Sequence, residues 1–132
     1  MNIFETWAAN WYGFTSPTQE SASSSWPYWK HLVDPTWNPN DKDQIVKYLE
    51  TASTAAVSGY EDMDCPVCKN AKWNPSHYRS DGVWLWPSDL AHFVDEHQMR
   101  IPERFLVHIR ASNYKPRDIK GIPVQSLPWP DQ

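Results

Sequence analysis

Several features that the sequence lacks narrow what this protein can be. No run of about eighteen apolar residues occurs anywhere, so we expect a soluble protein without a membrane-spanning helix. Residues 1–5 have neither a basic start nor an apolar stretch, so we expect no secretory signal and a cytoplasmic location. In that reducing compartment, the only 2 cysteines of the 132 residues predict a metal-binding or redox pair rather than a disulfide.

Tryptophan, in contrast, is abundant. The chain has 9 tryptophans and 12 prolines but only 4 glycines. Indole rings contribute most where they bury a large apolar area, so these tryptophans are expected to line either a core or a surface that meets a partner.

The spacing of apolar residues predicts a small single domain of the α+β class. Apolar side chains that recur every three or four residues indicate four helices, each with a start or stop signal. The helices are residues 1–14 ending near Gly13, residues 41–53 capped by Asn40 or Asp41, residues 88–97 capped by Ser88, and a helix with Pro102 as its first residue. Their core-facing positions include Ile45, Tyr48, Leu49 and Ala52, then Leu90, Phe93 and Val94, then Phe105, Leu106 and Ile109.

Short strands are predicted around a tight turn. The pair Asp81-Gly82 lies between two aromatic and β-branched runs. We expect a hairpin there, with a two-residue type I′ turn whose central residues both adopt positive φ. Pro87 ends the second strand of this hairpin, and residues 55–60 form a further short strand.

The cysteines belong to the pattern C-x2-C-x23-H-x4-H, formed by Cys65, Cys68, His92 and His97. Zinc prefers four such ligands in a tetrahedron, and a C-x2-C knuckle and a helix supply two each. The order knuckle, hairpin, helix is that of a ββα zinc finger in which the interval between the second cysteine and the first histidine is longer than usual. We expect this unit to pack on the additional helices. Histidines five residues apart lie about 140° apart on an ideal helix, so we expect His97 on a frayed or 3₁₀ last turn.

Other interpretations of these residues remain open. The cysteines can be ordinary buried thiols and the histidines satisfied core or surface side chains. His77 is an alternative zinc ligand. A thioredoxin-like redox pair is disfavoured, because the polar residues 61–64 precede the cysteines and Asn74-Pro75 interrupts the helix that such a pair opens.

The motifs of zinc enzymes are incomplete. Glu96 lies beside His97, but the segment from His92 to His97 is one residue too long for H-x-x-E-H and lacks the order of H-E-x-x-H. The zinc-deaminase pattern also fails, because no H-x-E precedes the cysteines and Pro66 lies inside the pair. We therefore expect a closed, non-catalytic Zn²⁺ site, with a zinc-dependent hydrolase as a distant alternative.

Residues 65–109 carry three distinctive motifs. These are the C-x2-C pair, the turn D-G-x-W-x-W-P that leads into L-A-H-x-V-x-x-H, and the R-x-P-x-x-F that follows. Together they resemble a zinc-finger-like signature of small uncharacterised bacterial proteins and cover about a third of the chain. The resemblance implies a zinc-type site at Cys65, Cys68, His92 and His97 in a bacterial cytoplasmic protein, and it implies no activity.

We divide the chain into three parts. Residues 1–40 form an aromatic, Ser- and Pro-rich arm with a short helix, residues 41–111 form the zinc-stapled core, and residues 112–132 form an extended tail, where prolines exclude regular structure. The tail is expected to dock through Ile119, Ile122, Val124 and Trp129.

The charge pattern gives two candidate classes of partner. The helix at 88–97 carries Asp89, Asp95 and Glu96 but no Lys or Arg, so it is unsuited to a DNA major groove. Residues 100–120 are basic and can either follow a phosphate backbone or pair with the acidic residues 1–68 of the same chain. The basic residues are Arg100, Arg104, Arg110, Lys115, Arg117 and Lys120.

The leading hypothesis is a non-catalytic, zinc-stabilised protein-interaction module. The net charge of -4 and the many aromatics fit an adaptor, an inhibitor or an immunity-type partner that masks a basic target, and nucleic-acid binding through residues 100–120 is the alternative. The predicted contact residues, for which core packing is the competing interpretation, are Trp26, Tyr28, Trp29 and Trp37.

Overall fold

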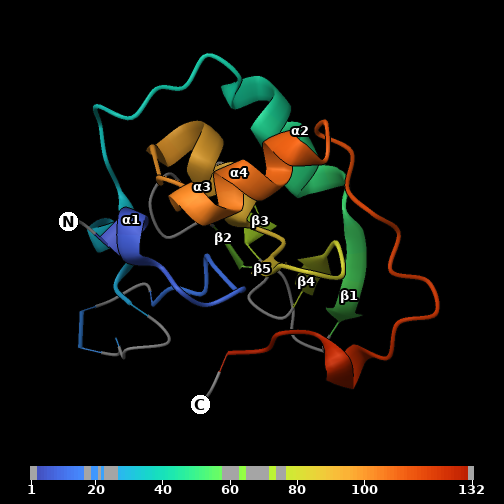
Figure 1. The fold of residues 1–132 in the computed structure, drawn as a ribbon. Coiled ribbons are helices and arrows are strands. Elements are labelled where there is room, and N and C mark those ends of the chain that lie inside the picture. Colours follow the sequence, from blue (N-terminus) through green and yellow to red (C-terminus); the bar gives the residue numbers. More distant parts are fainter. Residues whose placement is uncertain are drawn as a thin grey trace.

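Within the described residues, short helices precede and follow an uninterrupted series of short strands, which confirms the predicted α+β class (Figure 1). The computed structural model describes residues 3–16, 19–20, 22, 27–57, 63–64, 72–73 and 77–130. No helix within these ranges has the length and the apolar character that crossing a membrane requires. The helices are α1 (Ile3–Thr6), α2 (Lys42–Thr51), α3 (Leu90–His97) and α4 (Glu103–Ala111), with 3₁₀ turns η1 (Trp29–Leu32) and η2 (Val124–Ser126). The strands are β1 (Ser53–Val57), β2 (Met63–Asp64), β3 (Lys72–Trp73), β4 (His77–Ser80) and β5 (Leu85–Pro87).

A three-stranded antiparallel sheet with the order β1-β4-β5 contains the predicted hairpin. β4 and β5 form this hairpin, with Ser80 opposite Leu85. β1 pairs with the other edge of β4 and has a register shift between Thr54 and Ala56. The strand predicted at residues 55–60 is therefore present over residues 55–57 but begins earlier, at Ser53, and residues 58–60 lie outside the described part of the chain. β2 and β3 form a separate two-stranded antiparallel sheet.

The hairpin turn differs from the predicted two-residue turn. The loop between the paired Ser80 and Leu85 contains four residues, of which Gly82 has φ +91° while Asp81 does not adopt positive φ. The Asp81 Oδ1 atom accepts hydrogen bonds from the backbone N–H groups of Val83 (2.9 Å) and Trp84 (2.8 Å). Asp side chains favour such local turns, and this longer turn draws the carboxylate into the interior.

The main core lies between the hairpin and helices α2, α3 and α4. Trp84 stacks on Phe105 of α4, with ring centroids 4.3 Å apart and planes 2° apart. The indole N–H of Trp86 donates to the carbonyl of Leu49 in α2 at 3.0 Å, which satisfies the donor of a fully buried ring. The predicted core-facing positions of the three helices are all buried, namely Ile45, Tyr48, Leu49, Ala52, Leu90, Phe93, Val94, Phe105, Leu106 and Ile109.

The prediction of a helix over residues 1–14 is wrong beyond Thr6. Residues 10–12 instead pair with the edge of β5, because Leu85 donates to the Asn10 carbonyl and Tyr12 donates to the Leu85 carbonyl, both at 3.0 Å. Tertiary pairing therefore overrides the helical spacing of the apolar residues. The arm also supplies buried side chains to the main core, namely Phe4, Tyr12 and Leu32.

The helix starts also differ in detail from the predictions. α3 is preceded by Asp89 rather than Ser88 at its cap position, and Pro102 occupies the cap position of α4 instead of its first turn. Asp41 precedes α2 as predicted, but its carboxylate makes no capping hydrogen bond. That carboxylate instead binds Arg110 and Tyr114.

The proline-rich tail is extended apart from η2 and turns at residues 112–114 and 120–121. It docks on a second apolar cluster, separate from the main core, through half-buried Ile119, Ile122 and Trp129, as predicted. Val124 is 42% exposed, so the prediction that it docks is wrong. Leu127, which was not predicted as a docking residue, is buried in the second cluster at 4% exposure.

Candidate functional site

The two histidines of the predicted zinc site lie next to each other on α3. Their ring centroids are 4.9 Å apart and the ring planes are inclined by 83°. Cys65 and Cys68 lie outside the described residues, so the predicted ligand set is not tested. Among the residues that the structure describes, no group of three or more His, Cys, Asp or Glu side chains is placed to hold a metal ion.

The end of α3 explains how histidines five residues apart come together. His97 is the last helical residue and Gln98 adopts the left-handed conformation with φ 56°. The backbone N–H groups of Gln98 and Met99 both donate to the Phe93 carbonyl, so the closing turn is wider than an α-turn. We predicted a frayed or 3₁₀ last turn. The observed turn is wider instead, and in a wide turn five residues cover nearly one full turn.

The surroundings of His97 favour its neutral form. Burial lowers the pKa of His97 most strongly and the neighbouring His92 lowers it further, while Glu96 acts in the opposite direction. A neutral imidazole is the form that binds a metal ion. Both rings also contact Phe93, with centroids 6.0 Å from His92 and 5.5 Å from His97.

The remaining zinc predictions concern residues before α3. The sequence places Cys65 and Cys68 in the connection between β2 and β3, whose strands pair with Met63 opposite Trp73. His77, the alternative ligand, is half-buried at the start of β4, where its carbonyl accepts a hydrogen bond from the Ser88 N–H at 2.8 Å.

Two of the predicted contact aromatics are anchored in the core and also partly exposed. Trp29 and Trp37 are half-buried and pack against the main core, and the Trp29 ring lies 6.2 Å from that of Phe93. Tyr28 packs edge-on against Trp29 at 5.9 Å. The Lys30 Nζ atom lies 5.9 Å from the Tyr28 ring and 5.7 Å from the Trp29 ring. Trp26 lies outside the described residues.

Two arginines of the basic strip pair with acidic residues of the N-terminal half. Arg100 binds Asp34 at 3.0 Å, and Arg110 binds Asp41 at 2.8 Å. The hydrogen bond from Arg110 and a second one from Tyr114 lower the pKa of Asp41 to about 2, although burial opposes them. These contacts support the interpretation that the strip is matched within the molecule.

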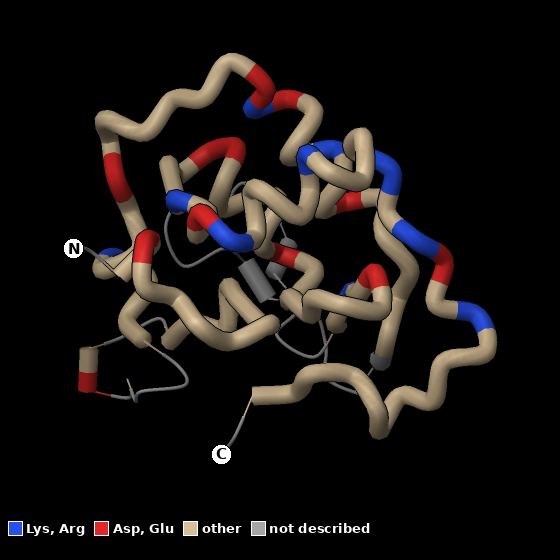
Figure 2. Tube along the Cα trace, viewed as in Figure 1, with Lys and Arg blue, Asp and Glu red and all other residues tan. Residues whose placement is uncertain are grey.

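The rest of the strip divides between contact and exposure. Arg104 donates to the carbonyls of Trp7 (3.2 Å) and Ala9 (3.1 Å). In Figure 2, basic residues follow one edge of the molecule, with an acidic residue among them. Lys115, Arg117 and Lys120 are exposed, as are Arg104 and Arg110 despite their contacts, and Asp118 lies between Arg117 and Lys120.

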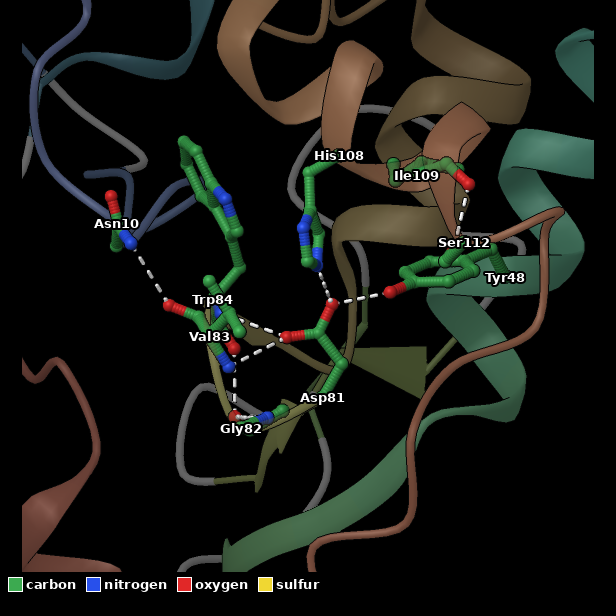
Figure 3. Close-up of polar contacts among 10 residues, drawn as sticks. Asn10, Tyr48, Asp81, Gly82, Val83, Trp84, His108, Ile109 and Ser112 are labelled. Carbon is green, nitrogen blue, oxygen red and sulfur yellow. Dashed lines mark hydrogen bonds and ion pairs between the residues drawn. The ribbon is translucent and has the colours of Figure 1, made fainter.

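A buried carboxylate network was not predicted from the sequence. Asp81 is 1% exposed, and its Oδ2 atom accepts hydrogen bonds from the Tyr48 hydroxyl of α2 and from Nε2 of His108 of α4, the latter at 2.7 Å (Figure 3). Together with the two backbone donors of the turn, four groups hold this carboxylate. Burial and the neighbouring Asp81 raise the pKa of Tyr48 well above its ordinary value. We call Asp81, Tyr48 and His108 the Asp81 node.

The Asp81 node joins elements rather than presenting a reactive group. Its carboxylate accepts two donors on each oxygen, so its capacity is filled by the hairpin turn, α2 and α4. A sequence signal for it did exist, because a tyrosine on an apolar helix face needs a buried hydrogen-bond partner.

Asp89 is a second buried carboxyl group, located just before α3. It is 8% exposed, and burial raises its pKa to about 8, although a bond from its own backbone N–H opposes this. At neutral pH this side chain is therefore largely protonated. Asp89, expected from the sequence to be one of the negative charges of the helix at 88–97, is instead buried.

Comparisons of the chain with protein-family models, with curated protein sequences and with solved structures found no match in any of the three.

Proposed function

We propose that this protein is a non-catalytic, zinc-stabilised protein-interaction module of the adaptor, inhibitor or immunity type. The observation that carries the proposal is the pair of adjacent imidazoles of His92 and His97, 4.9 Å apart at the end of α3. The C-x2-C pair lies in the connection between two paired strands and supplies the other two ligands. The chain order of paired strands, hairpin and helix supports a zinc-finger-like unit.

A stabilising role follows from the number of ligands. Two thiolates and two imidazoles complete a tetrahedron, which leaves no open position for water or substrate. The lowered pKa of His97 favours the neutral ligand. The proposed cytoplasmic location is consistent with cysteines that stay reduced and available to zinc.

The proposed contact surface consists of Tyr28 and Trp29. The Trp29 ring packs on Phe93, which lies between the two histidines in the sequence and contacts both rings. A metal at the histidines would therefore fix the helix on which this surface rests. Aromatic side chains that are anchored on one side and exposed on the other are typical of binding hot spots.

A basic protein surface is the partner that the charges favour. Asp95 and Glu96 are exposed on α3, shortly after Phe93, on which Trp29 packs, and they would complement cationic groups. Nucleic-acid binding is disfavoured because Arg100 and Arg110 are already paired with carboxylates.

The first experiment measures zinc in protein purified without chelator. We expect about one zinc per chain, since one four-ligand site binds one ion. Cys68→Ser and His92→Ala should lose the metal, whereas His31→Ala, an exposed histidine elsewhere, should keep it. Folded protein without zinc would contradict the proposal. Loss of zinc in His77→Ala but not in His97→Ala would show that His77, rather than His97, is the fourth ligand.

The second experiment separates the partner classes. A protein partner recovered from the native host should bind the wild type and be lost with Trp29→Ala, while that variant still unfolds in a cooperative thermal transition and so keeps its fold. Submicromolar, sequence-selective binding of duplex DNA at physiological salt would instead support the nucleic-acid alternative.

A further inference from the structure

The tail and the body of the protein meet through one set of apolar side chains. The body contributes Trp11, Phe14, Ala55, Tyr78 and Leu85, which we call the tail-binding face. The tail contributes Ile119, Ile122, Leu127 and Trp129. None of these four residues belongs to the main core within the described part of the chain.

The walls of the tail-binding face are aromatic. Phe14 and Tyr78 stack with centroids 5.7 Å apart, and Trp11 packs edge-on against Phe14 at 6.1 Å. The ring of Trp129 meets Tyr78 edge-on at 5.2 Å, and Leu127 is 4% exposed. The tail therefore packs one aliphatic and one aromatic side chain against this partly aromatic cluster of the body.

The two residues that flank η2 in the tail have dihedral angles typical of a proline-rich ligand. Pro123 has φ −62° and ψ 134°, and Leu127 has φ −72° and ψ 156°, close to polyproline II geometry. The indole N–H of Trp129 donates to the Val124 carbonyl at 2.8 Å, which holds the ring in place within the tail itself. Aromatic surfaces recognise such segments because proline stiffens them before they bind.

The tail is attached almost entirely through side chains. Across the described residues, every backbone-to-backbone hydrogen bond of residues 116–130 stays within that segment. A contact to the body is made by the Ile119 N–H, which donates to Ser53 Oγ at 3.4 Å. Release of the tail would break no strand ladder, and in Figure 1 the tail runs along the outside of the fold.

We infer that the tail-binding face is a docking site for an extended, proline-rich segment of a partner protein, and that the chain's own tail occupies it in the unbound protein. The inference rests on the proposed role as a protein-interaction module and adds a second surface to it. The tail, seated on this face, shows the chemistry that fits there: Leu127-Pro128-Trp129-Pro130, a leucine and a tryptophan held by prolines.

The test uses the full-length protein and two fluorescent peptides. The first peptide has the sequence of residues 119–130, and the second carries only Leu-Pro-Trp-Pro between Gly and Ser residues. The variant Leu127→Asp places a charge on the tail's buried contact and should free the face. We expect this variant to bind both peptides at least tenfold more tightly than the wild type.

Matched controls define the site. Val124→Asp changes an exposed residue of the same tail and should bind the peptides as weakly as the wild type. A peptide with alanine at the positions of Leu127 and Trp129 should bind at least tenfold more weakly to Leu127→Asp. If that variant is folded but binds no peptide, the tail is a permanent part of the fold and the inference is wrong.

Two further measurements cover the other outcomes. If Leu127→Asp does not fold, amide hydrogen exchange of the wild type decides, because a displaceable tail requires the Leu127 amide to exchange far faster than that of Leu106. Equal protection of the Leu127 and Leu106 amides from exchange would overturn the inference. A wild-type dimer that forms at micromolar concentration by exchange of tails would also overturn it. Zinc content does not enter this test, so failure of the zinc proposal and failure of this inference give different results.

Discussion

The main core and the second cluster are both apolar, but they are closed in different ways. Polar groups tie the main core together from inside, since the Asp81 node links the hairpin turn to α2 and α4 and the Trp86 indole binds the Leu49 carbonyl. The second cluster is closed by a tail whose backbone bonds are mainly its own. A buried polar network in which every group is hydrogen-bonded makes a region unfold as one unit. A segment held by side-chain packing alone can separate from the rest of the fold.

The largest expected effect comes from Asp81→Ala. The change leaves four donors without their acceptor. These are the Tyr48 hydroxyl of α2, the His108 ring of α4 and two backbone N–H groups of the hairpin turn. We expect a loss of about 3 to 5 kcal/mol in the free energy of unfolding, as for other buried groups left unpaired. Urea denaturation measures this loss. A change below about 1 kcal/mol would show that the node does not brace the main core.

Asp81→Asn is the matched control. Its amide oxygen can still accept hydrogen bonds from the two backbone N–H groups of the turn. Its NH₂ group, which is a donor, takes the place of the oxygen that accepts from His108. We therefore expect an intermediate loss, smaller than that of Asp81→Ala.

The next prediction concerns the buried carboxyl of Asp89. Its pKa of about 8 lies above the ordinary 3.8, so the folded state holds a proton that the unfolded state releases between these values. Stability is therefore fully retained below about pH 4 and falls as the pH rises toward 8. Asp89→Asn removes this fall and should stabilise the protein by about 2 to 4 kcal/mol at pH 9 and by little at pH 4. Melting curves at both values test this, and a pH-independent difference would refute it.

A pair of glycine substitutions compares the body with the tail. Gly13 has φ +90°, and an added Cβ would lie 2.9 Å from Leu90 Cδ1. Gly121 has φ +88° but nothing within 4 Å of an added Cβ. Gly13→Ala adds a clash to backbone strain and should cost about 2 to 3 kcal/mol, while Gly121→Ala should cost about 1 kcal/mol from strain alone. Equal losses in chemical denaturation would mean that the contact with Leu90 is relaxed at no cost.

The sequence predicted the parts of the fold that depend on local patterns. The buried faces of α2, α3 and α4 follow from helical spacing, and the hairpin follows from Asp81-Gly82 between strand-forming runs. The helix over residues 1–14 failed because the same spacing also suits a segment that pairs with β5 at Leu85. Such a contact between residues far apart in the chain leaves no periodic signal.

In the candidate site, too, the features that depend on local sequence were predicted and those that depend on contacts between distant residues were not. The pairing of His92 and His97 followed from a motif within one helix, and its geometry required a turn that residue types do not specify. The Asp81 node could not be assembled from the sequence, because Tyr48, Asp81 and His108 come from three elements. Asp81 carried a strong turn signal, which hid its second role as a buried acceptor.

The smallest expected effect concerns Asp41, which also joins α2 to α4, but at the surface. Its pKa of about 2 lies below the ordinary 3.8, mainly because Arg110 donates to the carboxylate. The stabilisation is therefore present above about pH 4 and lost as the pH falls toward 2. Arg110 is 43% exposed, so solvent screening limits the pair to about 0.5 to 1 kcal/mol. Asp41→Asn and Arg110→Gln should each lose this amount at pH 6, and neither should differ from the wild type near pH 2. If Asp41→Asn instead cost as much as Asp81→Ala, burial would not be what separates the two carboxylates, and the contrast between a braced interior and a weakly tied surface would fail.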